Sequence, residues 1–254
     1  MKRIILIHHH IFKNAGTSFN YALNQAFGKQ FMEYDLPGGQ LVSPAILEEA
    51  IQANPQVNAI SGHHIAMPTP QGENFQTISS VLIRKPLSRI RSIYNFERNQ
   101  KAETAGAIKA KELDFKGFVL WRLQTSPIVF CNYQTYYCSR TELMKPKYSP
   151  TEADLKLAIE NLKSAAIVGT VEQYNETLAI AQTCLQKSFE DPAIDLTPVS
   201  LNISSKGVAS DDEIRNKLVK DLGEDLVARL EEMNQLDNAL YQVVSSMLKE
   251  NIQA

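Results

Sequence analysis

The amino-acid sequence predicts an α/β fold in which a central, mostly parallel sheet is flanked by helices. Short runs rich in Ile and Val alternate along the chain with longer segments of helical periodicity. Such alternation is typical of parallel strands that are connected by helices. The 254 residues suffice for one large domain with a sizeable core. No repeat, low-complexity segment or convincing linker divides them, so we expect a single domain over residues 1–254.

The predicted strands are apolar throughout, as expected for strands that are buried on both faces of a sheet. They cover residues 3–9, 57–61, 78–84 and 165–170. The predicted helices cover residues 17–27, 44–53, 86–99, 114–123, 151–162, 171–187, 210–221 and 224–250. The stretch 101–148 is less regular and contains Trp121, the only tryptophan. We expect it to form an insertion over one edge of the sheet.

Composition limits the possible partners and the setting. The formal net charge of −2 gives no overall basic field for a nucleic acid, so any anion site must be local. Three cysteines make neither a disulfide framework nor a metal-ligand pattern, which favours a reduced, cytoplasmic location. The apolar run at the N-terminus is too short for a signal peptide, and we expect no transmembrane segment.

The segment IHHHIFKNAGTSFNYAL, residues 7–23, joins the first predicted strand to the first predicted helix. A tight turn at this place exposes backbone N–H groups beside the positive end of the helix dipole, which favours a phosphate. Residues 14–18 would supply the amides, Gly16 the close approach and Lys13 a mobile cation. An ordinary capped helix with a surface lysine explains this segment alone equally well.

An ATP- or GTP-binding P-loop is the natural alternative for such a turn. Its pattern GxxxxGK[ST] places the lysine directly before the Ser or Thr, whereas Lys13 here precedes Gly16 by three residues. A P-loop enzyme also needs an acidic residue near the end of a neighbouring strand to hold magnesium. The matching strand here ends in Arg84. The pattern therefore favours a site that holds phosphate with protein charge and without a metal.

The segment RKPLSRIRSIY, residues 84–94, offers a second anion site. Arg84 closes the strand, Pro86 suits the first turn of a helix, and Ser92 follows two turns later. A guanidinium and a hydroxyl in this arrangement would hold one further phosphate. For Arg89 and Arg91 we expect a solvated helix face. A ligand with two separated phosphates fits the two sites together.

The motifs HIFKNAGTSF and RKPLSRIRSIY resemble the HIPKTGGTSF and RDPxxRxxSxY segments of the sulfotransferases that use 3′-phosphoadenosine 5′-phosphosulfate (PAPS). The resemblance is greatest to the branch of the heparan sulfate 2-O- and 6-O-sulfotransferases. It implies a P-loop-like three-layer α/β fold and PAPS as sulfuryl donor, with 3′-phosphoadenosine 5′-phosphate (PAP) as product. It assigns 3′-phosphate roles to Arg84 and Ser92. Roles at the 5′-phosphosulfate fall to Lys13, Asn14, Ala15, Gly16, Thr17 and Ser18.

Weaker similarities follow in NYQTYY, VGTVEQYNETL and LNISSKG, so that the resemblance spans most of the chain. In the last of these, Ser204 and Lys206 are candidates to close over the 3′-phosphate or the adenine, and a surface loop explains them nearly as well. Two positions depart from the family pattern. Phe12 replaces a proline, and Lys85 replaces an aspartate, where its charge would either strengthen anion binding or face solvent.

Transfer to an alcohol needs a base for the hydroxyl proton and a cation at the leaving phosphate. His63 and His64 follow the strand 57–61, and the related glycan sulfotransferases carry a histidine proposed as the base at the comparable place. We choose His63 as base and Lys13 as the cation, and His64 stays the alternative base. His8 and His9 are expected to be structural.

The sequence thus predicts a PAPS-dependent O-sulfotransferase that acts by in-line transfer to a hydroxyl-bearing acceptor. The acceptor is a carbohydrate or a small-molecule or lipid-like alcohol, and the apolar, aromatic stretch within 101–148 suits an acceptor-side role. Two alternatives stay open: a P-loop nucleotide kinase, and a non-catalytic module that binds 3′-phosphoadenosine nucleotides. The sequence does not indicate an oligomeric state.

Overall fold

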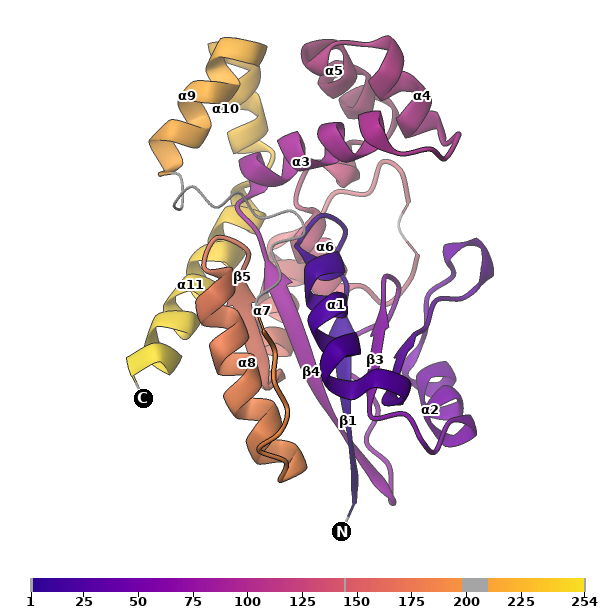
Figure 1. Cartoon of the computed structure of the whole chain (residues 1–254). Helices are drawn as coiled ribbons and strands as arrows, with labels where there is room; N and C mark the ends of the chain where they lie inside the picture. Colours follow the sequence, from indigo (N-terminus) through magenta and orange to yellow (C-terminus); the bar gives the residue numbers. More distant parts are fainter. Residues whose placement is uncertain (1, 144, 198–209, 254) are drawn as a thin grey trace.

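The computed structural model describes residues 2–143, 145–197 and 210–253. Its centre is a five-stranded, all-parallel sheet in the order β2-β3-β1-β4-β5 (Figure 1). Helices cover both faces of this sheet, so the chain has the predicted three-layer α/β architecture. Within the described residues, no helix is long and apolar enough to cross a membrane.

The strands follow the predicted apolar runs closely. β1 spans Arg3–His9, β3 spans Ala59–Gly62, β4 spans Phe75–Ile83 and β5 spans Ile167–Thr170. The additional strand β2, Phe31–Glu33, was not predicted. It is only three residues long and lies at the edge of the sheet, where no apolar run is needed.

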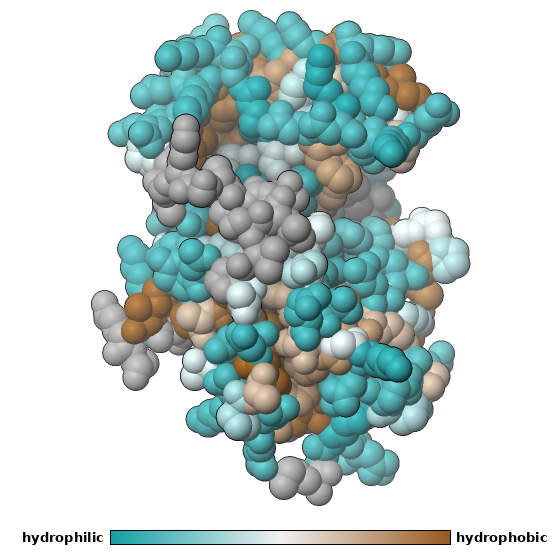
Figure 2. Space-filling model, in the orientation of Figure 1, coloured by the Kyte–Doolittle hydropathy of each residue, from teal (hydrophilic) through white to brown (hydrophobic). Residues whose placement is uncertain are grey.

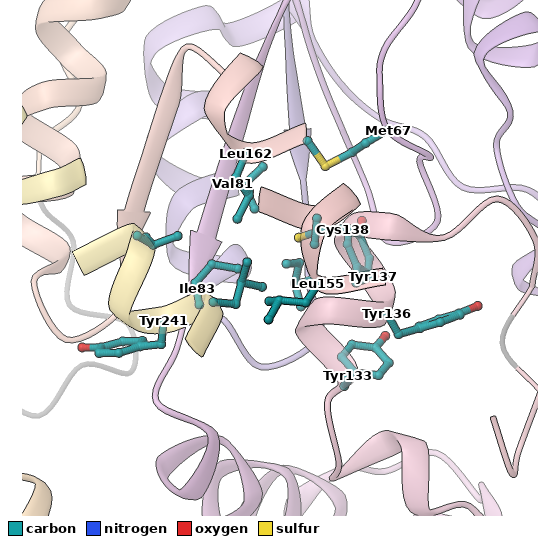
Figure 3. Close-up of a cluster of buried hydrophobic side chains, with 14 of the residues drawn as sticks. Met67, Val81, Ile83, Tyr133, Tyr136, Tyr137, Cys138, Leu155, Leu162 and Tyr241 are labelled. Atoms are coloured by element: carbon teal, nitrogen blue, oxygen red, sulfur yellow. The ribbon is translucent and has the colours of Figure 1, made fainter. Parts of the chain in front are cut away.

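Alternate residues of the strands pack on opposite faces. Leu6 of β1 and Leu82 of β4 contact α1, Gly16–Phe27, and α8, Tyr174–Phe189. The other face carries α2, Pro44–Ala53, α6, Tyr133–Ser139, α7, Glu152–Ser164, and α11, Gln235–Gln253. Figure 3 shows this second layer, where Val81 and Ile83 lie among side chains of α6, α7 and α11.

Five helices form a helical cap beyond the carboxyl ends of the strands (Figure 1). They are α3, Pro86–Asn99, α4, Ala105–Glu112, α5, Phe115–Thr125, α9, Asp211–Leu222, and α10, Glu224–Glu232. The cap has its own apolar core, which includes Ile90, Phe118, Leu218 and Val227. In the space-filling view, the surface narrows between this cap and the sheet layers (Figure 2).

The prediction of one helix over 224–250 is wrong, because the chain forms α10 and α11 with Met233 and Asn234 between them. The Asn234 side chain donates to the Leu230 carbonyl at 2.8 Å and accepts from the Asn132 amide at 3.1 Å. It thereby ends α10 and ties the break to a distant part of the chain, a contact that local periodicity does not reveal.

The region 101–148 contributes to two different layers. Helices α4 and α5 belong to the helical cap, whereas α6 packs against α7 in the sheet layers. Buried Asp237 of α11 accepts from the Gln134 amide at 3.1 Å and the Thr135 amide at 2.7 Å, at the start of α6. Helices α4 and α6 were not predicted; these hydrogen bonds stabilise α6, and α4 packs into the core of the helical cap through Ala110.

Candidate functional site

The loop between β1 and α1 has two residues in the left-handed backbone region, Lys13 at φ 67° and Ala15 at φ 59°. Ala15 is the N-cap of α1 and makes no side-chain cap hydrogen bond. Left-handed residues in such a loop gather successive amides into a concave anion site, and the N-terminus of the helix adds its dipole. The local backbone therefore has the form that the sequence predicted for a phosphate-binding turn.

Two arginines, buried Arg89 and half-buried Arg84, hold two carbonyl groups of this loop. Arg89 Nε donates to the Phe12 carbonyl at 3.0 Å, and an Arg84 guanidinium N–H donates to the Lys13 carbonyl at 2.9 Å. The side chain of Asn14 is buried and donates to the Leu82 carbonyl at 2.8 Å. These three contacts fix the path of the loop against the end of β4, including at Phe12.

The expectation that Arg89 lies on a solvated helix face is wrong. The side chain is 1 % exposed, donates also to the Val129 carbonyl at 2.8 Å, and lies over the Tyr133 ring at 4.2 Å from its centroid. Arg91, two residues further along α3, is half-buried against the Phe115 ring and pairs with Asp221. The loop carbonyl and the aromatic ring draw Arg89 inward, which helical periodicity alone could not show.

A cavity of about 670 Å³ opens at the meeting point of the loop, α3 and α9. Lys13, Arg84 and Ser92 all line it, so the structure brings the two predicted anion sites together. Arg91 and Lys217 add two further cations, and within the described part of the chain none of the lining residues is acidic. The described residues that line it are Lys13, Arg84, Leu87, Ser88, Arg91, Ser92, Asn95, Phe96, Asn99, Gln100, Ile214, Lys217 and Leu218.

The ammonium group of Lys13 lies close to an aromatic ring and to other positive charges in this site. Its ammonium lies 4.2 Å from the centroid of the Phe96 ring. Burial first, and then the charges of Arg84 and Arg89, lower the pKa of Lys13 to about 8. An anion bound beside Lys13 would relieve this repulsion and favour the protonated form.

Gln134 is a site residue that the sequence analysis missed, although it lies in the segment NYQTYY. Its Oε1 accepts from the Arg84 amide and from Asn14 Nδ2, both at 2.7 Å, and its Nε2 donates to the Arg84 carbonyl at 2.8 Å. One buried amide therefore joins the first motif to the second. The only signal in the sequence was a weak family similarity at this position.

Glu172, in the segment VGTVEQYNETL, is the second missed residue. It follows β5 and accepts from the Lys85 amide at 3.2 Å. Burial raises the pKa of Glu172, and the nearby Arg84 acts in the opposite direction. Lys85 itself pairs with Asp211 at the start of α9 at 2.7 Å, so its charge is directed at a protein carboxylate.

His63 lies at the same sheet edge as the loop because β1 and β3 are adjacent, with His9 opposite Gly62. Its Nδ1 lies 3.0 Å from the His10 carbonyl, which can only accept. The proton is therefore on Nδ1, and Nε2 carries the free lone pair. Two more contacts fix this residue: its amide donates to Asp35 at 2.8 Å, and its carbonyl accepts from Arg140 at 2.9 Å.

His8, His9 and His64 have different surroundings. His8 and His9 are buried and contact Ser80 and Ser79, which is a structural arrangement. The pKa of His64 is lowered, first by burial and then by the charge of Arg140.

Among the other predicted cofactor-binding residues, Ser18 is buried at the start of α1 whereas Thr17 is exposed. Ser204 and Lys206 lie outside the described residues.

Comparison with known proteins identifies the family. The sequence profile described as "Sulfotransferase family" matches residues 2–242, nearly the whole chain. The chain is also similar to an uncharacterized protein of Archaeoglobus fulgidus, with 27 % identity over 265 residues that cover 98 % of this chain and 99 % of that protein. The range matched by the family profile contains the residues of the loop, the cavity and the histidine pair described above. The chain therefore belongs to the sulfotransferase family and is an enzyme that transfers sulfuryl groups.

Proposed function

We propose that the protein transfers a sulfuryl group from PAPS to the hydroxyl group of an acceptor. The observation that carries this proposal is the cationic cavity in which Lys13, Arg84 and Ser92 meet. A volume of about 670 Å³ lies in the range of sites that bind small ligands. Its lining of basic side chains, hydroxyls and amides suits a ligand with two anionic groups, and no acidic side chain among the described lining residues repels such a ligand.

In this proposal the loop holds the 5′-phosphosulfate. Lys13 supplies charge, and the amides and hydroxyls of residues 14–18 (Asn14, Ala15, Gly16, Thr17, Ser18) supply hydrogen bonds. Arg84 and Ser92 hold the 3′-phosphate from the end of β4 and from α3. Ser204 and Lys206 are proposed to complete this end of the site.

His63 is proposed to take the acceptor proton on Nε2, because Nδ1 is engaged by the His10 carbonyl. As the acceptor oxygen forms its bond to sulfur, the bond from sulfur to the phosphate oxygen breaks, and Lys13 stabilises the negative charge that develops there. His63 later releases its proton to solvent. His64 stays the alternative base, since it shares the contact to Asp35.

The acceptor is proposed to be a carbohydrate or a small-molecule or lipid-like alcohol. The resemblance to the heparan sulfate 2-O- and 6-O-sulfotransferases supports the carbohydrate. The aromatic stretch within 101–148 offers less free surface than its composition suggests. Phe118, Phe130, Tyr133 and Tyr137 are buried in the two apolar cores, whereas Phe96 is 40 % exposed and lines the cavity beside Lys13. We propose that α4 and α5 border the acceptor side of the site.

The proposal is tested by comparing nucleotides in the absence of magnesium. PAP should raise the melting temperature more than AMP or ATP, because only PAP fills both anion sites. Transfer of radiolabelled sulfate from PAPS to a panel of sugars, phenols and aliphatic alcohols then identifies the acceptor class. Phosphate transfer from ATP with magnesium would instead favour a nucleotide kinase, and tight PAP binding without transfer to any acceptor would favour a non-catalytic module.

A further inference from the structure

The ring of His10 lies between the loop and the candidate base. His10 follows β1 directly, and its ring centroid lies 3.9 Å from that of His63, with the two planes inclined by 34°. On the loop side, a Cβ atom added to Gly16 would overlap the His10 ring. The first residue of α1 is therefore glycine for a reason that needs no ligand, since only a hydrogen leaves room for this imidazole.

His10 is held from both its backbone and its side chain. Its amide donates to the Gly62 carbonyl at 3.0 Å, and its carbonyl accepts from His63 Nδ1 at 3.0 Å. The Asn20 amide nitrogen lies 3.4 Å from His10 Nδ1 and can only donate, so the His10 proton is on Nε2. Asn20 is itself fixed, because its Oδ1 accepts from Ser61 at 2.6 Å.

His10 is uncharged, as is required of a side chain that lies beside the candidate base His63. Burial, His63 and Lys13 together lower the pKa of His10 to about 3. The ring is therefore neutral at physiological pH and does not compete with His63 for the acceptor proton.

We propose that His10 is a positioning residue for the transfer reaction. Its ring holds the His63 imidazole at a fixed distance and inclination relative to the start of α1. The ring thereby keeps His63 at a constant position relative to the loop that begins α1 at Gly16. This inference rests on the proposed function, in which His63 takes the acceptor proton.

Two variants remove the ring. His10→Ala truncates the side chain, and His10→Asn keeps a polar atom near Asn20 and so protects the fold. Misplacement of a reacting group by about 1 Å can lower the rate by about 100-fold. We therefore expect kcat of both variants to fall by at least about 10-fold, with the Kd for PAP within about 3-fold of wild type.

Turnover is measured with radiolabelled PAPS and the best acceptor of the panel, and also as sulfate release to water. Asn24→Ala, at an exposed position of α1, is the matched control.

The double variant His10→Asn/His63→Ala decides whether His10 acts through the base. We expect its turnover to equal that of His63→Ala alone, because a positioning residue has no effect once its partner is removed. Additive losses, or normal kcat in both His10 variants, would overturn the inference and leave the proposed function intact. Normal turnover of His63→Ala would instead remove the base assignment, and the positioning role with it.

Discussion

Replacing Arg84 by alanine tests the two-anion description of the cavity. The substitution removes a guanidinium that lines the cavity and also donates to the Lys13 carbonyl at 2.9 Å and to Ser88 Oγ at 3.1 Å. A charge-assisted hydrogen bond contributes about 1.5–3 kcal/mol, which corresponds to a loss of about 10- to 150-fold in affinity for PAP. AMP lacks the 3′-phosphate, so its affinity should change much less.

Calorimetric titration of PAP and AMP, without magnesium, measures both affinities. The decisive quantity is the ratio of the two Kd values, because any distortion of the loop weakens both nucleotides alike. Arg84→Lys should fall between wild type and Arg84→Ala, since lysine keeps the charge but not the planar fork. Lys220→Ala, at an exposed position of α9, removes the same charge away from the cavity and serves as control. Equal losses for PAP and AMP would refute a 3′-phosphate contact and leave Arg84 as a support of the loop.

Three further predictions concern Lys13, His63 and Arg89. Burial and the charges of Arg84 and Arg89 together lower the pKa of Lys13 to about 8. PAP affinity should therefore decrease as the pH rises through 8 and the ammonium loses its proton; Lys13→Met should bind more weakly and lose this pH dependence in titrations between pH 7 and 9. His63→Ala should lower kcat by about 100-fold or more and keep PAP affinity, whereas an inactive His64→Ala beside an active His63→Ala would move the base by one residue. Arg89→Leu should lower the free energy of unfolding by at least about 2 kcal/mol, because it leaves the Phe12 and Val129 carbonyls unpaired at about 1–3 kcal/mol each; an unchanged denaturation midpoint would show that these carbonyls find other partners.

The sequence alone determined the features that depend on neighbouring residues. Strand β1 and helices α2 and α3 have the predicted bounds, because apolar runs and prolines at the first turn act locally. The sequence likewise predicted the turn between β1 and α1 and the position of Arg84 at the end of β4. In a parallel sheet both lie at the same edge, so their meeting in one cavity followed from the predicted architecture.

The tertiary structure alone decided what distant residues do to one another. The break between α10 and α11 depends on Asn132, about a hundred positions earlier in the chain. Gln134 reaches both Arg84 and Asn14, and Arg89 turns inward toward the Phe12 carbonyl. A buried polar group needs a hydrogen-bond partner wherever the fold supplies one, and that partner has no fixed spacing in the sequence. Periodicity therefore places the helices and strands, whereas the pairing of buried polar groups places the side chains of the site.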